Sequence, residues 1–230
     1  MSSRPVLRLD WCSHQAAKFA VMRWHYSKTM PVGKMVKIGV WEDGTFIGCL
    51  LFSWGANQHI GRPYGPRVTQ VAELVRVALN RHVAPVTRIV SVAIKMLRRQ
   101  SPGLQLLVSY ADTTEGHLGI IYQAGNWIYT GETKPETFYS INGKIMHRRA
   151  FTGQQFGRKR TALPQSASPV SSPGKHRYIY PLSEEIRNRI QPLSRPYPKR
   201  AGSIADDATA NHAGEGGLIP TPALQLQASP

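Results

Sequence analysis

Apolar and polar positions along the chain follow two repeats, one that suits strands and one that suits helices. Two apolar runs flank Glu42-Asp43-Gly44, and the Asp-Gly pair predicts a β-hairpin over residues 35–55. Residues 85–99 carry apolar side chains at helical spacing, and Arg98-Arg99 suit the carboxyl end of a helix. The sequence therefore predicts a hairpin followed by an amphipathic helix.

The same patterns predict the remaining elements. A helix is expected over residues 13–24, capped by Ser13, and a short helix after Gly116. Strands are expected over 72–80, 104–112 and 126–131, and two more flank an Asn142-Gly143 turn. This order predicts a mixed α/β (α+β) fold, in which a partly antiparallel sheet is flanked by helices.

The end of the chain has a different composition. From residue 154 onward Pro, Ser, Ala, Gly and Arg dominate, and apolar periodicity fades. We expect residues 1–155 to form one domain and residues 156–230 to be a basic, mostly irregular or disordered tail. The basic run GRKR at 157–160 either contacts phosphate or is simply solvated.

Charge favours a polyanionic partner. The formal net charge is +16, and the excess is not confined to the tail: residues 1–155 hold 19 Lys/Arg against 8 Asp/Glu. Nucleic acid is the usual partner of such a chain, and a basic surface kept for solubility is the alternative. Double-stranded DNA is the partner we expect.

Other features exclude whole classes of protein. Neither GxxxxGK[ST] nor GxGxxG occurs, so no known phosphate-cradling motif is present. Cys12 and Cys49 form no CxxC pair and predict no disulfide framework. The first residues lack the apolar run of a signal peptide, and no run reaches the ~18 apolar residues of a membrane helix. We expect a cytoplasmic protein that does not enter a membrane.

A first candidate cluster lies at the end of the first helix, in Arg23-Trp24-His25-Tyr26-Ser27-Lys28. His25 is a base or metal ligand by type, and Tyr26 can donate or accept a proton. Trp24 can stack on a base and Lys28 can hold phosphate. The alternative is a helix end where cations suit the dipole and aromatic rings cover the core.

A second set of candidates surrounds the strand 72–80. Glu73 and Arg76 are three residues apart, so on a regular strand they face opposite sides. Residues near the start of the next helix could bind an anion there, or the charges could simply face solvent. The candidates for donor binding are Arg76, Asn80, Arg81, Thr87 and Arg88. In the preceding Gly/Pro-rich loop, Arg62, Tyr64 and Arg67 are candidates for substrate contact.

The third cluster follows the strand LLVSYAD, which ends at Asp112. Alternation places Tyr110 and Asp112 on one face, at a strand end, where open α/β sheets place their sites. With Ser109 and His117 nearby, a carboxylate, a phenol and an imidazole come within reach for proton transfer. Glycines at 116 and 119 allow close backbone approach. The alternative is that Asp112 caps the next helix.

The strings SYAD…GH.G.IYQA..W.Y.G, ELVRVALN and HYSK resemble the Mom family of phage DNA-modification proteins, over roughly residues 10–150. The resemblance implies a GCN5-related acyltransferase-like fold. It also implies a transferase that places a carbamoylmethyl (acetamido) group on the exocyclic amine of adenine in DNA, which protects phage DNA from host restriction. The host cytoplasm would then be its location.

For this reaction a base must be extruded from the duplex and its amine deprotonated. Trp24, Tyr26, Trp54 and Tyr64 could receive the base. The candidates for catalysis are Asp112, Tyr110, Tyr26, His25 and Ser109. His25, Tyr26 and Asp112 could also hold a divalent metal such as iron. The oligomeric state stays open, a homodimer included.

The donor is not fixed by the resemblance. Members of the acyltransferase superfamily bind coenzyme A phosphates with a Gln/Arg-x-x-Gly-x-Gly/Ala loop, whereas this chain has Arg81-His-Val-Ala-Pro-Val at that place. Ala84 and Pro85 obstruct close backbone approach. Acyl-coenzyme A and an aminoacyl or glycyl carrier therefore both remain as donors. A non-catalytic, basic DNA-binding regulator is the alternative function.

Overall fold

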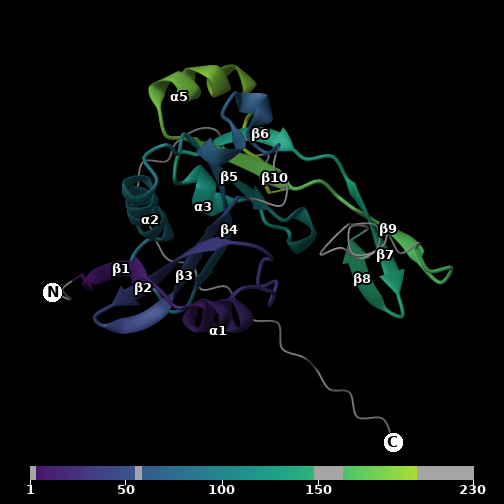
Figure 1. Cartoon of the computed structure of the whole chain (residues 1–230), viewed down its shortest axis with the longest axis horizontal. Coiled ribbons are helices and arrows are strands. Elements are labelled where there is room, and N and C mark those ends of the chain that lie inside the picture. The colour runs from purple at the N-terminus through teal and green to yellow at the C-terminus, as the bar shows by residue number, and fades with distance from the viewer. Residues whose placement is uncertain (1–3, 55–58, 148–162, 201–230) are drawn as a thin grey trace, which may run out of the picture. The chain divides into compact units, whose positions relative to one another are not determined.

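The computed structural model describes residues 4–54, 59–147 and 163–200. Residues up to Pro198 form one compact unit, and Lys199 and Arg200 belong to a second unit that otherwise lies outside the described residues. The first unit contains a seven-stranded sheet in the order β1-β2-β3-β4-β5-β10-β6 (Figure 1). Neighbours in this sheet are antiparallel except β4 and β5.

The amino-terminal half of the sheet contains the expected helix, hairpin and strand, together with an edge strand, β1, that was not predicted. Ser13 caps α1 by accepting a hydrogen bond from Ala16 N at 3.1 Å. Asp43 and Gly44 both have positive φ, which the tight turn between β2 and β3 requires. The elements are β1 (Leu7–Trp11), α1 (His14–Trp24), β2 (Met35–Glu42), β3 (Thr45–Ser53), η1 (Arg62–Tyr64), η2 (Val68–Gln70) and β4 (Val71–Leu79). The predicted first helix and hairpin are thus confirmed.

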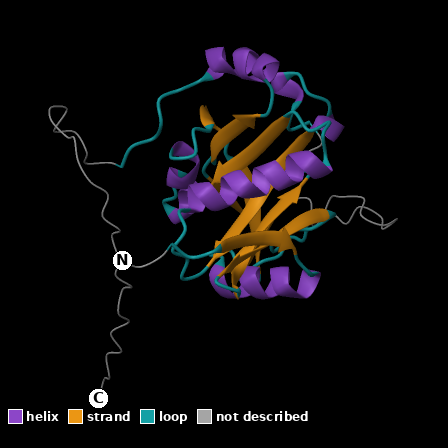
Figure 2. Ribbon diagram, turned by 90° about the vertical axis from the view of Figure 1, so that its left-hand side faces the viewer, coloured by secondary structure: helices purple, strands orange, loops and turns teal. Residues whose placement is uncertain are grey.

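The central elements also follow the apolar pattern. α2 buries Ile89, Val90, Ala93, Ile94 and Leu97 along one face, as helical spacing requires. The elements are α2 (Val86–Gln100), β5 (Leu106–Ala111), η3 (Thr113–Glu115), α3 (Ile120–Gln123) and β6 (Ile128–Glu132). The predicted mixed α/β class, a partly antiparallel sheet flanked by helices, is confirmed (Figure 2).

The region expected to be an irregular tail differs from that expectation between residues 163 and 200. β10 (His176–Pro181) pairs with both β5 and β6, so a strand from the tail joins the edge strand β6 to the rest of the sheet. β9 (Ser168–Ser172), α5 (Glu184–Ile190) and η4 (Gln191–Leu193) are also ordered elements. The domain boundary expected at residue 155 therefore separates strands that are hydrogen-bonded to one another. The GRKR run at 157–160 lies outside the described residues.

The two strands around the Asn142-Gly143 turn form a separate small sheet. β7 (Glu136–Ile141) pairs with β8 (Lys144–His147) on one side and with β9 on the other. Both turn residues have positive φ, as the predicted tight turn requires. Ile145 is 65% exposed, so this small sheet presents apolar as well as polar side chains.

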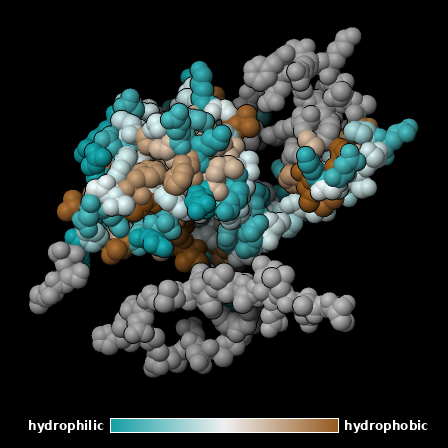
Figure 3. Space-filling view, turned by 90° about the horizontal axis from the view of Figure 1, so that it is seen from below, coloured by the Kyte–Doolittle hydropathy of each residue, from teal (hydrophilic) through white to brown (hydrophobic). Residues whose placement is uncertain are grey.

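Three apolar clusters fill the two faces of the main sheet. One face, covered by α2 and α3, holds the largest cluster, which includes Leu50, Leu107 and Tyr178. On the other face α1 covers β3 and β4, and α5 covers β5 and β10 through Ile186 and Ile190. On the side of the molecule where α1 lies, hydrophilic side chains surround smaller apolar patches (Figure 3). Cys12 and Cys49 are both free thiols.

No helix among the described residues is long and apolar enough to span a bilayer.

Candidate functional site

The site begins where the two parallel strands part. β4 and β5 pair only from Val71 with Leu106 to Glu73 with Val108, and beyond that point each strand pairs with another neighbour. A bulge in β4 lies beside this split, because Phe52 pairs with Leu74 whereas Leu51 pairs with Arg76. Bulges of this kind redirect side chains and occur often next to active sites.

The bulge overturns one expectation from the sequence. Ser53 pairs with Glu73 and Leu51 with Arg76, and residues two apart on β3 share a face. Glu73 and Arg76 therefore lie on the same face, and the charge of Glu73 acts on the Arg76 guanidinium. The extra residue, Val75, shifts the alternation by one and brings the two charges together.

A hydrogen-bonded bridge crosses the opening between the strands. Ser109 on β5 is fully buried, and its Oγ donates to Leu74 O on β4 at 2.8 Å. The same Oγ is hydrogen-bonded to the hydroxyl of Tyr122 on α3 at 2.7 Å. The Ser109 side chain thus links β5 to β4 beyond the last backbone pair of the two strands. Its hydrogen bond to Tyr122 also holds the Tyr122 hydroxyl between them.

Aromatic and imidazole rings gather at the mouth of this gap. The ring of Tyr26 lies 4.4 Å from that of His25 and 4.8 Å, edge-on, from that of His117, measured between centroids. Arg76 Nη2 and Nε donate to Thr29 O at 3.3 and 3.4 Å, which ties the loop after α1 to β4. Tyr26 remains 44% exposed, so its ring is accessible to a ligand.

The protonation of the buried rings follows from their surroundings. Burial, with Arg76 and His117 nearby, lowers the pKa of His25 to about 4. Its Nδ1 accepts a hydrogen bond from Ser27 N at 3.1 Å, so the ring is neutral at pH 7 with its proton on Nε2. Burial raises the pKa of Tyr122 to about 12 and also raises the pKa of Tyr26. Both phenols are therefore proton donors at neutral pH.

Asp112 has two partners at the end of β5. Its Oδ1 accepts hydrogen bonds from Thr114 N at 3.1 Å and Thr114 Oγ1 at 2.6 Å, which caps η3. Its Oδ2 accepts from Lys175 Nζ at 2.8 Å. Partial burial acts to raise the pKa of Asp112, but the hydrogen bonds from Lys175 and Thr114 outweigh it, and the net pKa is lowered. A carboxylate of low pKa is a poor proton acceptor at pH 7, which favours a positioning role.

Tyr110 points away from this cluster. It lies on the face covered by α5, opposite Arg177 of β10, and belongs to the second apolar cluster. Burial, with the charge of Glu73, raises its pKa above the ordinary value. The sequence predicted that Tyr110 and Asp112 act together from one face. In the structure each has a different neighbour: Tyr110 lies opposite Arg177, and Asp112 binds Lys175.

The candidate metal ligands do not form a metal-binding group. In the described part of the chain, no three side chains of His, Cys, Asp or Glu come close enough together to hold a metal ion. Asp112 is engaged by Lys175, and Nδ1 of His25 is engaged by Ser27. The expected divalent iron held by His25, Tyr26 and Asp112 therefore has no support from the geometry.

The loop into α2 does not fit the phosphates of coenzyme A. Glu42, only 6% exposed, accepts hydrogen bonds from Val83 N at 2.9 Å and Ala84 N at 2.7 Å. Pro85, the next residue, has no N–H to offer. The chain's own carboxylate thus takes the amides that a phosphate would need. The expected donor-binding residues Asn80, Arg81, Thr87 and Arg88 surround this filled loop, and Arg76 binds Thr29 O instead.

The expected DNA-contacting residues divide into two groups. Tyr64 is 2% exposed and belongs to the second apolar cluster, whereas Trp24 is partly buried and packs on Phe19 and Phe46 at the edge of the third cluster. Lys28 has positive φ and donates to Arg23 O at 3.4 Å. Arg62 and Arg67 are exposed, at η1 and before η2.

Comparison with protein-family models assigns the chain to a family. A model of the Mom protein family matches residues 6–199. The chain belongs to the Mom protein family. It is 26% identical over 203 residues to the methylcarbamoylase Mom of Escherichia phage Mu, which covers 84% of each chain.

Solved structures that are similar to this member of the Mom family include acetyltransferases. One is a putative acetyltransferase from Acinetobacter baylyi, with 15% identity and a TM-score of 0.45, covering 79% of this chain and 95% of that one. Another is a Bacillus subtilis acetyltransferase in complex with coenzyme A, with 10% identity and a TM-score of 0.44, covering 78% of this chain and 100% of that one.

Two members of this Mom-family site were not predicted from the sequence. Tyr122 lies in IIYQAG, which the pattern assigns to a core helix, and only the fold directs its hydroxyl to Ser109. Lys175 lies in the region expected to be an irregular tail, and its contact with Asp112 spans 63 positions. The signal in the sequence was the apolar run YIY, which begins three residues later at Tyr178.

Proposed function

We propose that this chain is a DNA-modifying transferase that places a carbamoylmethyl (acetamido) group on the exocyclic amine of adenine. The observation that carries the proposal is family membership combined with the ring cluster at the β4–β5 split. The relative from phage Mu is named a methylcarbamoylase. The modified DNA would be protected from host restriction, and the enzyme would act in the host cytoplasm.

The adenine would be flipped out of double-stranded DNA toward Tyr26. This ring is 44% exposed and packs against His25 and His117, so an extruded base can stack or dock beside it. The net charge of +16 favours attraction of the DNA backbone. Trp54, 51% exposed at the end of β3, is a second aromatic surface for the base.

The chemistry needs proton transfer, because the exocyclic amine must lose one proton as the new N–C bond forms. His117 is exposed beside Tyr26, and imidazole is the side chain that most often acts as a general base. The phenols of Tyr26 and Tyr122 stay protonated and can donate to a leaving group or to the substrate. Asp112 would position Lys175 and the η3 turn that leads to His117.

The donor would be an activated carrier of the transferred group. Acyl-coenzyme A and an aminoacyl or glycyl carrier are the candidate donors. With either one, the adenine amine would attack the carbonyl carbon and release the thiol or hydroxyl of the carrier, which forms an N–C(=O) bond. The carbamoylmethyl group is joined through its methylene carbon, so a rearrangement must follow; a glycyl group already holds every atom of the product, whereas an acetyl group lacks the amide nitrogen. The filled loop at Glu42 favours a carrier that does not depend on phosphate contacts there.

Mass spectrometry of nucleosides tests the proposal. DNA from cells that express the chain should contain the modified adenine, and Tyr26→Phe or His117→Ala should abolish or greatly reduce it. Tyr139→Phe, on the separate small sheet, is the matched control and should modify DNA normally. Labelled glycine and labelled acetate, fed in parallel, identify the donor by which label enters the base.

The outcome that contradicts the proposal is also defined. An unaltered adenine profile under donor-replete conditions, together with duplex binding that survives Tyr26→Phe, would indicate a non-catalytic DNA-binding regulator instead. In that case Lys and Arg substitutions would lower affinity and the salt dependence of binding, with no effect on base composition.

A further inference from the structure

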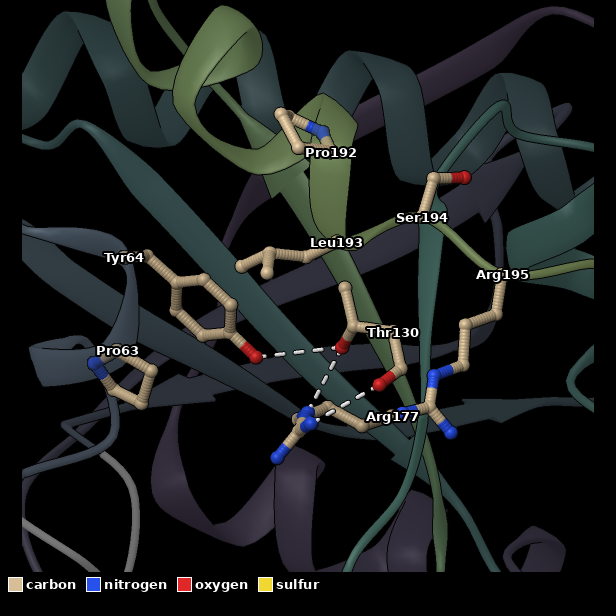
Figure 4. Close-up of a pocket in the computed structure, with 8 residues that line it drawn as sticks. All are labelled: Pro63, Tyr64, Thr130, Arg177, Pro192, Leu193, Ser194 and Arg195. Atoms are coloured by element: carbon tan, nitrogen blue, oxygen red, sulfur yellow. Dashed lines mark hydrogen bonds between the residues drawn. The ribbon is translucent and has the colours of Figure 1, made fainter.

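A polar pocket lies on the face of the sheet that α5 covers, apart from the ring cluster. It has a volume of about 410 Å³ (Figure 4). Four separate elements supply its walls: η1, β6, β10 and the segment after α5. The lining residues are Pro63, Tyr64, Thr130, Arg177, Pro192, Leu193, Ser194 and Arg195. Nothing in the proposed reaction uses this pocket.

Arg177 is held in a fixed orientation on the pocket wall. Its Nε donates to Thr130 Oγ1 at 2.9 Å and its Nη2 to Thr130 O at 3.1 Å (Figure 4). The hydroxyl of Tyr64 lies 3.3 Å from the same Thr130 Oγ1. Tyr64 and Thr130 are almost fully buried, so they form a rigid floor that carries the guanidinium. A preorganised guanidinium loses little conformational entropy when it binds an anion.

The second guanidinium of the pocket belongs to Arg195, whose backbone is fixed by a hydrogen bond. Arg195 N donates to Tyr129 O at 2.9 Å, which fixes the segment after η4 against β6. Gly131 has φ +89°, and a Cβ there would lie 3.0 Å from Arg195 Nη1. The glycine therefore leaves the space that the Arg195 side chain occupies. Arg195 also lines a neighbouring cavity of about 550 Å³ together with Arg187.

The chemistry of the lining selects an anion with several oxygens. Two guanidinium groups and the hydroxyls of Tyr64, Thr130 and Ser194 face the pocket, and no carboxylate is among the described lining residues. Arginine forks match the geometry of phosphate oxygens. A purely apolar ligand would displace water from the Arg195 guanidinium and from the part of the Arg177 guanidinium that does not bind Thr130, without replacing those hydrogen bonds, which is costly.

The pocket and the ring cluster are connected by the start of strand β10. Arg177 is the second residue of β10, and Lys175, immediately before β10, binds Asp112. Two residues of extended chain span roughly 6–7 Å. Arg177 also lies opposite Tyr110, beside the strand end that carries Asp112. One short segment thus carries a cation to each of the two sites.

The geometry points to this pocket as the binding site for a backbone phosphate of the DNA, next to the base being modified. The inference rests on the proposed function in taking DNA as the substrate. A phosphate carried by the donor has the same chemistry, and the experiment distinguishes the two sources.

The test measures binding, so that it does not depend on catalysis. Fluorescence anisotropy of a labelled duplex of about 20 base pairs is followed over a salt series for the wild type, Arg195→Gln and Arg177→Lys. Arg99→Gln, exposed at the end of α2 on the opposite face, is the control. Arg195→Gln should lower the magnitude of the salt slope by about one and weaken binding, because one phosphate contact is lost. Arg177→Lys keeps the charge and should weaken binding less.

Each outcome decides the inference. Equal salt slopes for Arg195→Gln and the wild type would overturn it, as would an equal loss for Arg99→Gln. If duplex binding is unchanged but inorganic pyrophosphate raises the melting temperature of the wild type and not of Arg195→Gln, the pocket binds a donor phosphate and the DNA assignment is wrong. Thermal unfolding of each variant checks that the fold is retained.

The proposed function is tested separately by nucleoside analysis. Loss of modification in Tyr26→Phe with intact binding would support the enzyme and leave this pocket unaffected. Absence of modification in the wild type, with the predicted change in salt slope for Arg195→Gln, would contradict the proposed reaction and still support the pocket.

Discussion

The carboxylate of Glu42 accepts a hydrogen bond from Ala84 N at 2.7 Å, across 42 positions of sequence. A second bond from Val83 N, at 2.9 Å, completes a two-point contact with the loop that leads into α2. Backbone amides at such a place ordinarily attract anions from solution. Here an internal anion on β2 satisfies them, so the loop has a structural role in joining β2 to α2.

Replacing Glu42 with Gln should destabilise the protein. The amide group of Gln can accept a hydrogen bond through its oxygen but presents N–H to the second backbone donor, which is left unsatisfied. The expected loss is about 1–3 kcal/mol of unfolding free energy, measured by urea denaturation. Glu185→Gln, at a site whose side chain is 75% exposed, should change it by less than about 0.5 kcal/mol. Equal stability of the two variants would contradict the role given to Glu42.

Coenzyme A should not stabilise the wild-type protein. A ligand that binds only the native state raises the melting temperature, and the rise grows with the logarithm of ligand concentration above Kd. Because Glu42 already takes the amides of Val83 and Ala84, thermal unfolding with millimolar coenzyme A should match unfolding without it. A rise that depends on coenzyme A concentration would show that its phosphates bind despite the filled loop.

The two glycines that flank His117 should differ in their tolerance of alanine. Both have positive φ, of +66° at Gly116 and +71° at Gly119, so both substitutions strain the backbone. A Cβ at Gly116 meets open space, whereas one at Gly119 would lie 2.4 Å from the ring of Tyr178. Gly116→Ala should cost about 1 kcal/mol and Gly119→Ala roughly 1–3 kcal/mol more. Denaturant unfolding of the pair measures the difference, and equal costs would contradict the close approach seen at Gly119.

As the pH is lowered, protonation of His25 should destabilise the protein first, and protonation of Asp112 should do so only at lower pH. The folded-state pKa of His25 is lowered to about 4 from an ordinary 6.5, so its neutral form is preferred in the fold. Its contribution to stability is complete above pH 6.5 and is lost as the pH falls to about 4. Asp112, whose pKa is also lowered, loses its contribution only at lower pH.

His25→Gln should therefore flatten the decrease of melting temperature between pH 6.5 and 4. His14→Gln, at an exposed position at the start of α1, should leave the wild-type profile unchanged. If the two variants gave the same profile, His25 would not be the group that titrates in this window.

The hydrogen-bonded bridge between β4 and β5 predicts that substitution of Ser109 mainly lowers stability, whereas substitution of Tyr122 mainly lowers activity. Ser109→Ala leaves the carbonyl of Leu74 without its donor in the core and should cost about 1–3 kcal/mol of stability. Tyr122→Phe keeps the ring in the apolar cluster and should cost about 1 kcal/mol, but it removes a proton donor from the gap. Modified adenine should then fall roughly 10²-fold or more in Tyr122→Phe. Wild-type levels of modification in this variant would exclude its hydroxyl from the chemistry.

Local pattern was enough to predict the elements whose stability is mainly local. The Asp43-Gly44 and Asn142-Gly143 turns need residues that tolerate positive φ, and the helices near Ser13 and Ile89 carry their own cap or apolar face. The sequence also indicated that His25, Tyr26 and His117 are candidates, because these side chains are chemically distinctive and gather in short stretches. Their rings are in contact in the structure, and their role in the chemistry stays a prediction.

Contacts distant in sequence were decided only by the tertiary structure. A bulge at Val75 reverses the faces expected for Glu73 and Arg76, because one extra residue shifts a period of two. β10 carries Lys175 and Arg177 to Asp112 and to the pocket, yet its sequence lies among Pro and Ser residues that suggest disorder. Strand pairing between residues more than 60 positions apart leaves no local periodicity to detect, since its stability comes from burial against neighbours that only the fold supplies.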